Sequence, residues 1–187
     1  MKFQRRSIVT RLHVVAISVA MTNGLLPLRA SALDQAFSPP IHAPWGKVAD
    51  NKIYAQKVVN DVMAENPELV ALGLHAVPPG VDAKPGEPGE VSIAQVIDNI
   101  GEPDSPGDLE IAHQQAVKIF VGTFKGIPRM RVMAPLRDGS GRVIGLALFA
   151  FKDVEMAPIS AHLKADRILE QLAARFPDQA SLFKAMP

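Results

Sequence analysis

The sequence contains no cysteine and few aromatic residues. Its 187 residues include one Trp, one Tyr and eight Phe. Without cysteine the chain has no disulfides, no thiolate metal ligands and no thiol nucleophile, which excludes disulfide scaffolds, zinc–thiolate sites and covalent c-type haem attachment. Stability must come from a hydrophobic core, and 48% hydrophobic residues in a chain of this length allow one ordinary domain.

No hydrophobic run is long enough to cross a membrane, which takes roughly 18 or more apolar residues. The first 32 residues instead carry a basic start, a shorter apolar stretch at 12–21 and the small residues Ala-Ser-Ala at 30–32. This order predicts a secretory signal peptide over residues 1–32, and hence a mature protein in the periplasm or outside the cell. Retention as an anchor stays an alternative, and the pair Arg5-Arg6 leaves twin-arginine export open.

Positive charge is scarce once this segment is removed. Residues 1–32 hold five of the 20 basic residues and none of the 19 acidic ones, so the remaining chain has 15 basic and 19 acidic side chains, a net charge of −4. It contains no cluster of four or more basic residues. An acidic protein repels phosphate backbones and anionic lipid, so we expect no nucleic-acid partner and no stable membrane insertion after cleavage.

The remaining chain predicts an extended arm followed by one α+β domain. Residues 33–49 contain three prolines and no periodicity. Apolar residues recur at helical spacing over 50–65, with Asp50 placed to cap this helix. The segment 77–89 holds four Pro and three Gly and predicts a long surface loop.

Five segments indicate strands, and two more indicate helices. The run 143–151 is apolar on both faces, which predicts a strand covered on both sides. The tight turns before and after 127–137 predict hairpins. We therefore expect residues 50–187 to form a five-stranded antiparallel sheet with a long N-terminal helix and a C-terminal helix capped by Ser160. The predicted strands are 69–77, 91–96, 118–124, 127–137 and 142–152, and the later helices run from 106 or 108 to about 117 and from 160 to 176.

This order of elements is that of a PAS-like sensor domain. Tyr54–Val59 (YAQKVV), Asp98–Glu102 (DNIGE) and Met133–Gly145 (MAPLRDGSGRVIG) resemble the single-Cache family of extracellular sensor domains, over roughly residues 51–176. The resemblance implies a pocket on the sheet for a small molecule, often a carboxylate or an amine. Family members usually sit between two membrane helices of a receptor. This chain shows no second such helix and no kinase or chemotaxis domain, so we expect any signal to pass to a separate membrane receptor.

Three residues are candidates for ligand binding. Arg129 and Arg131 alternate along one face of a predicted strand, roughly 7 Å apart, where two guanidinium groups could clamp a carboxylate. Solvated arginines at a sheet edge are the alternative. His75 ends an apolar strand, where it could face the bound molecule or ligate haem or a metal, although a surface or hydrogen-bonded core histidine is the commoner reason for such a position.

Other motifs give little support for catalysis or for a cofactor. The acidic residues between 98 and 110 could hold a hard cation, but their spacing fits no calcium loop, and helix capping explains them as well. The chain has no nucleophile elbow, no dinucleotide fingerprint and no P-loop. The sequence thus predicts a non-catalytic exported module, without metal or cofactor, that binds a small polar or anionic ligand. Alternatives are an enzyme using Arg129, Arg131 and His75, or an adaptor that docks on a membrane receptor.

Overall fold

The computed structural model describes residues 47–186. The predicted signal peptide and residues 33–46 of the predicted arm lie outside this range. The described chain begins with a short 3₁₀ helix, and its elements follow the predicted order. They are η1 (Val48–Asp50), α3 (Tyr54–Glu65), β1 (Leu69–Ala76), β2 (Val91–Ala94), α4 (Pro106–Gln114), β3 (Lys118–Phe124), β4 (Ile127–Arg137), β5 (Val143–Phe151), α5 (Pro158–Arg175) and α6 (Gln179–Leu182).

The five strands form one antiparallel sheet in the order β2-β1-β5-β4-β3. The predicted α+β, PAS-like fold is therefore confirmed. β5 is the middle strand, as its two apolar faces indicate, and its side chains from Ile144 to Ala147 are buried. β2 and β3 are the edges. The segment 101–104 hydrogen-bonds to β2 and to Glu90 just before it, which leaves β3 as the open edge.

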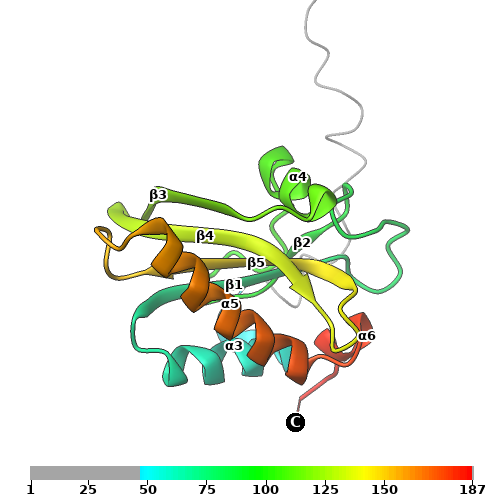
Figure 1. Ribbon diagram of the computed structural model, residues 1–187. Helices are drawn as coiled ribbons and strands as arrows, with labels where there is room; N and C mark the ends of the chain where they lie inside the picture. The colour runs from blue at the N-terminus through cyan, green and yellow to red at the C-terminus, as the bar shows by residue number, and fades with distance from the viewer. Residues whose placement is uncertain (1–46, 187) are drawn as a thin grey trace, which may run out of the picture.

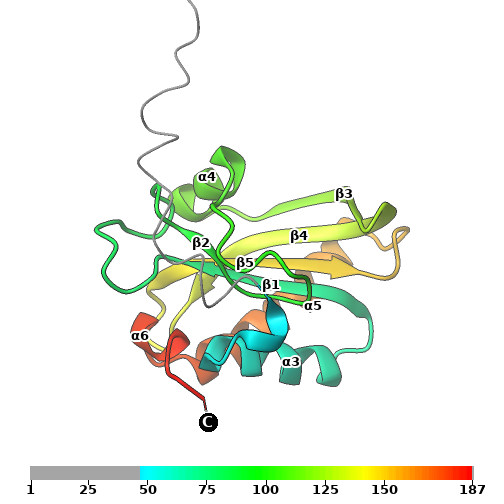
Figure 2. The same cartoon turned by 180° about the vertical axis from the view of Figure 1, so that it is seen from behind.

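Helices cover the two faces of the sheet unequally (Figures 1 and 2). α3 and α5 lie against one face, where their apolar sides pack on Val132, Phe149 and other buried residues of the main core. α4 lies on the opposite face and covers only a smaller apolar cluster around Met133 and Leu146. The face that carries α4 therefore has space for a cavity.

Two predicted helix starts are wrong. α3 begins at Tyr54 rather than at Asp50, because Ile53 pairs with Ala185 and the Tyr54 amide donates to the Lys184 carbonyl, which keeps the preceding residues extended. α5 begins at Pro158 rather than after Ser160. The fixed φ of proline suits the first helical position, where no amide donor is needed.

Two further details of the helices depart from the prediction. Leu163, whose helical spacing from Ile168, Leu169 and Leu172 predicts a buried position in α5, is 52% exposed. α4 ends at Gln114, three residues before the predicted end, because Gln115 adopts a left-handed conformation with φ of 53°.

The loop predicted over residues 77–89 is present. In the part of the chain that the structure describes, no helix combines the length and the apolar character that a membrane span requires.

Candidate functional site

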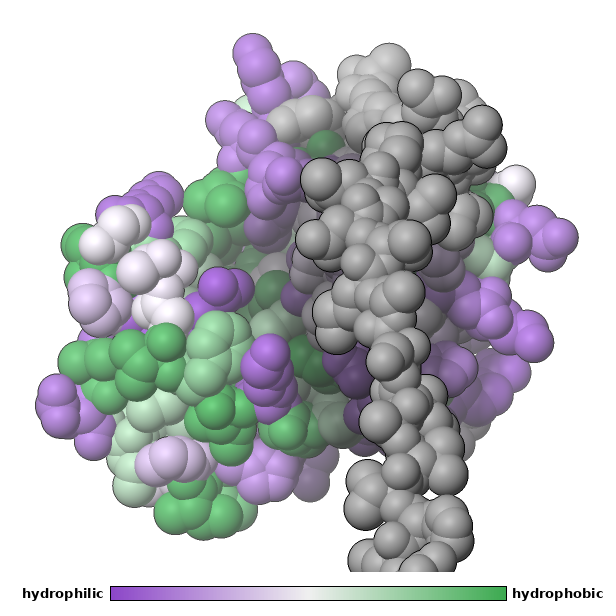
Figure 3. All heavy atoms as spheres, turned by 90° about the horizontal axis from the view of Figure 1, so that it is seen from above, coloured by the Kyte–Doolittle hydropathy of each residue, from purple (hydrophilic) through white to green (hydrophobic). Residues whose placement is uncertain are grey.

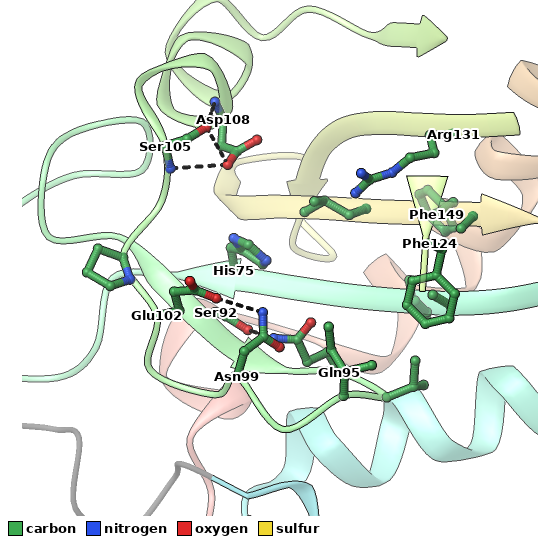
Figure 4. A pocket seen from close by; sticks show the side chains of 17 residues that line it. His75, Ser92, Gln95, Asn99, Glu102, Ser105, Asp108, Phe124, Arg131 and Phe149 are labelled. Atoms are coloured by element: carbon green, nitrogen blue, oxygen red, sulfur yellow. Dashed lines mark hydrogen bonds between the residues drawn. The ribbon is translucent and has the colours of Figure 1, made fainter. Parts of the chain in front are cut away.

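A cavity of about 310 Å³ lies on the sheet face opposite α3 and α5 (Figure 4). Its floor is formed by β1, β4 and β5, and the segment between β2 and α4 forms one wall. Alanine and leucine side chains supply apolar surface at Ala71, Leu148 and Ala150. Such a mixture of apolar walls and few polar groups is typical of small-molecule sites. The polar side chains are His75, Ser92, Gln95, Asn99, Glu102, Ser105, Asp108 and Arg131.

Arg131 brings a positive charge into this cavity from β4. Its guanidinium carbon lies 5.6 Å from the centre of the Phe120 ring, on the neighbouring strand β3. No hydrogen bond or ion pair joins the guanidinium to another described residue. Figure 4 shows the group extending over the sheet toward the middle of the cavity. Its donors are therefore free to bind an oxygen-rich ligand.

Arg129 has a different environment, although it shares the sheet face with Arg131. Its Nη1 donates to the Lys152 carbonyl over 3.3 Å, and its buried Nε has no partner within the described chain. It is not among the residues that line the cavity. The structure thus brings His75 and Arg131 together at one cavity and leaves Arg129 outside.

His75 lies at a bulge in β1, opposite Ser92 of β2. Its Nδ1 donates to Oδ1 of Asp104 over 2.5 Å. This hydrogen bond fixes the ring so that its other nitrogen is left for the cavity. The His75 side chain is 12% exposed and that of Asp104 is fully buried. β5 approaches closely here, since a Cβ added to Gly145 would lie 1.9 Å from the His75 carbonyl oxygen.

A second carboxyl group, that of Glu90, lies beside this pair. Glu90 directly precedes β2, and its carbonyl accepts from the Asp104 amide over 3.1 Å. Its side chain enters the interior, where the residue is only 1% exposed and Oε2 accepts from the Gly86 amide. Oε1 of Glu90 and Oδ2 of Asp104 are buried and have no hydrogen-bond partner in the described structure. We call Glu90, His75 and Asp104 the buried triad.

The three groups of the buried triad shift one another's protonation. Burial lowers the pKa of His75, but the attraction of Asp104, Asp108 and Glu90 outweighs this effect and raises it above 6.5. Burial is also the main reason that the pKa of Glu90 rises from 4.5 to about 7, with a further contribution from the negative charge of Asp104. Burial and mutual charge thus move the pKa values of both Glu90 and His75 upward.

Amide side chains fix the wall beside the triad. Gln95 donates from Nε2 to Oγ of Ser92, and its backbone is held at both ends by the buried Gln56 of α3. Asn99 donates to the Glu102 carboxylate over 2.9 Å. Because these bonds link α3, β2 and the following loop, the wall has a defined shape before any ligand binds.

The acidic residues between 98 and 110 take separate structural roles. Asp98 accepts from the Val48 amide, Asp104 pairs with His75, and Asp108 forms a capping box with Ser105 at the start of α4. Within residues 47–186, no three or more His, Asp or Glu side chains are arranged so that they could hold a metal ion. Helix capping, one of the two explanations considered for this stretch, is what Asp108 provides.

Fold and site together define a PAS-like domain with a polar cavity on one face of its sheet. No family model matches the chain, and no curated protein matches it. Among solved structures, it is similar to a type II free methionine-R-sulfoxide reductase from Thermoplasma acidophilum (13% identity, 73% of this chain and 97% of that one, TM-score 0.48). It is also similar to the DcuS sensor domain of E. coli (13% identity, 73% and 90%, TM-score 0.37). At TM-scores below 0.5, neither likeness defines an activity for this chain.

Proposed function

We propose that this chain is an exported, non-catalytic module that binds a small anionic molecule in the cavity above its sheet. The observation that carries this proposal is the Arg131 guanidinium, which enters the cavity without a hydrogen bond or ion pair to any described residue. Protonated His75 adds a second cationic donor to the same cavity. Carboxylates are suitable ligands because guanidinium binds them through two parallel hydrogen bonds.

A thermal-shift screen with small organic acids, amines and haem tests the proposal. A ligand at saturating concentration stabilises a protein in proportion to the logarithm of its concentration over Kd. We expect organic acids to raise Tm by several degrees and amines of similar size to have no effect. If no compound raises Tm and the protein instead captures a membrane receptor, the adaptor alternative is favoured.

Arg131 and Arg129 form a matched pair for testing the site itself. Losing one charge-assisted hydrogen bond costs roughly 1.5 to 3 kcal/mol, so Arg131→Gln should weaken binding of an acid found by the screen about 10- to 100-fold. Arg129→Gln removes the same charge from the same strand but outside the cavity, and should change affinity less than about threefold. Calorimetric titration of both variants measures this difference, and equal losses would contradict the proposed site.

An acid–base enzyme is a second candidate, favoured by the His75–Asp104 hydrogen bond. A carboxylate that orients an imidazole also prepares it for proton transfer. Recovering the bound acid after prolonged incubation separates the two functions. The binding module returns the compound unchanged, whereas an enzyme returns a product.

Export is proposed from the order of charged, apolar and small residues in the first 32 positions. We expect the mature chain to begin near Leu33 and to occur in the periplasm or the medium, where it delivers its signal to a separate membrane receptor. Mass spectrometry of protein from the native host measures the mature N-terminus. An intact Met1 in the membrane fraction would contradict cleavage.

A further inference from the structure

We propose that the buried triad couples anion binding in the cavity to the uptake of one proton. This inference rests on the proposed function and adds a form of regulation to it: the module would bind its anion tightly below neutral pH and release it above. The coupling follows from where the three groups lie and from how few partners they have.

The first step concerns the charge that the interior must hold. With both carboxylates ionised and His75 protonated, the triad carries a net charge of −1. Asp104 and Glu90 are both almost fully buried. Uncompensated charge in such a setting is costly, and a proton removes it. Asp104 already neutralises His75 through their hydrogen bond, so the additional proton belongs on Glu90.

The second step concerns the hydrogen bonds that would stabilise an ionised Glu90. The Glu90 carboxylate receives one bond, from the Gly86 amide, and Oε1 has no donor in the described structure. A carboxylate that accepts about two or three amide hydrogen bonds is held in its charged form, because each bond favours that form. A protonated Glu90 needs one acceptor for its new O–H group. Oδ2 of Asp104 can be that acceptor, since it is a buried oxygen of the same cluster without a partner in the described structure.

The third step links the triad to the cavity. His75 belongs to both, since its ring lines the cavity and its Nδ1 binds Asp104. The other charged groups facing this region are Asp108 and Glu102 from the loop and α4, and Arg131 from β4. An anion placed here is repelled by an ionised Glu90 and attracted by protonated His75. By linkage, the anion therefore favours the protonated triad, and protonation favours the anion.

Two NMR measurements on the mature protein test the coupling. Because burial and the neighbouring Asp104 raise the pKa of Glu90 to about 7, we expect its side-chain carboxyl carbon to show a midpoint there instead of near 4.5. Acetate serves as the probe for binding, since it stays ionised between pH 6 and 8. We expect its Kd, measured from shifts of the Arg131 side-chain signals, to increase about tenfold between these pH values.

Glu90→Gln is the decisive variant, because it fixes the group in a neutral form of the same shape. We expect the tenfold change in its acetate Kd between pH 6 and 8 to be largely lost, with any remaining pH dependence coming from His75. Glu155→Gln, at an exposed residue outside the cavity lining, serves as the control and should keep the tenfold change. If Glu90→Gln unfolds, the carboxyl titration and acetate binding of the unaltered protein still decide the matter.

The outcomes separate this inference from the function on which it rests. A Glu90 midpoint below pH 5, or acetate binding with the same Kd at pH 6 and 8, overturns the coupling and leaves anion binding intact. No acetate binding at either pH overturns the coupling, and a screen without any responding acid overturns the proposed function as well.

Discussion

Single residues decide how the strands and the cavity fit together. Gly145 is one of them, because a Cβ at this position would meet the His75 carbonyl oxygen at 1.9 Å. Separating β1 from β5 to make room would disturb two of the three strands that form the cavity floor. The same contact fixes the part of β1 that carries His75 in place.

Gly145→Ala is therefore expected to destabilise the protein by about 3 kcal/mol or more, among the larger effects of single substitutions. Gly107→Ala is the matched control. An added Cβ there meets only Oγ of Ser105, at 3.8 Å, inside helix α4. Alanine should stabilise this helix by roughly 0.5 to 1 kcal/mol. Urea unfolding of both variants measures the two effects. A Gly145→Ala variant that is as stable as the unaltered protein would contradict the close approach of β1 and β5.

Asp104 determines the protonation of His75. Burial alone lowers the pKa of the imidazole, and the negative charge of Asp104 is the largest of the influences that raise it. Asp104→Asn should therefore lower the pKa of His75, which a proton NMR titration of the ring signals follows directly. Asp82→Asn, at an exposed position of the 77–89 loop, should leave that pKa where it is. An unchanged titration of His75 in Asp104→Asn would rule out the ion pair.

At this scale the sequence predicted part of the site. Residue alternation identified Arg131, and the end of an apolar strand identified His75. Glu90 was missed, and Asp104 was considered only as part of the acidic stretch 98–110, because the two meet only through pairing between 90–91 and 103–104, distant segments that no local pattern connects. The sequence around Glu90 could have identified this residue as a buried carboxylate. It is a single acidic residue between Gly89 and the apolar start of β2.

Elements were easier to predict than their ends. Short apolar runs bounded by turn residues located all five strands to within about two residues, because glycine and proline end strands and tight turns join neighbouring ones. Helix starts were missed where tertiary contacts decide them, as for Tyr54, whose amide bonds to a carbonyl 130 positions later in the chain at Lys184. The short helix α6 was not predicted, since four residues carry no periodic signal.

The β4–β5 hairpin depends on one carboxylate at its turn. Asp138 accepts from the amides of Ser140 and Arg142, from the Ser140 hydroxyl and from the Arg142 guanidinium. These bonds, first among them that of the Ser140 hydroxyl, lower the pKa of Asp138 from 3.8 to about 2. The hairpin in turn aligns β4, which carries Arg131, with β5.

The pH dependence of this contribution follows from the lowered pKa. Because folding favours the ionised form, Asp138 stabilises the fold above its unfolded pKa of about 4 and loses this effect as the pH falls toward 2. Asp138→Asn should lower Tm at pH 7, and the difference from the unaltered protein should shrink between pH 4 and 2. Calorimetry of both proteins between pH 7 and 2 measures this difference in Tm. Asp153→Asn, in an exposed loop, is the control.

At the scale of the whole molecule, we consider two surfaces of residues 47–186 that other molecules could contact. One is the cavity. The other is the uncovered sheet edge formed by β3. Hydrophobic side chains are exposed along this edge and at the neighbouring start of α5. Figure 3 shows hydrophobic surface gathered on the side of the molecule where this edge lies. A signal carried to a membrane receptor would have to leave through a surface of this kind. Large exposed apolar residues on β3, its flanks and α5 are Val117, Val121, Ile127, Ile159 and Leu163.

The buried triad also makes the stability of the whole domain depend on pH. The pKa of Glu90 is 4.5 when unfolded and about 7 when folded, so the folded state binds more protons between these values. By linkage, stability is greatest below pH 4.5 with respect to this group and falls as the pH rises to 7. The raised pKa of His75 acts in the same direction, since its favourable interaction with Asp104 is lost as the pH rises through the folded value.

We therefore expect the free energy of unfolding to decrease by roughly 2 to 3 kcal/mol between pH 5 and pH 8, because the pKa of Glu90 rises from 4.5 to about 7 on folding. Glu90→Gln should remove most of this decrease, because glutamine needs no proton to remain neutral. Urea titrations at the two pH values measure it, with Glu155→Gln expected to behave like the unaltered protein. A stability that rises between pH 5 and 8 in the unaltered protein would mean that Glu90 enters the folded state already ionised, with donors of its own.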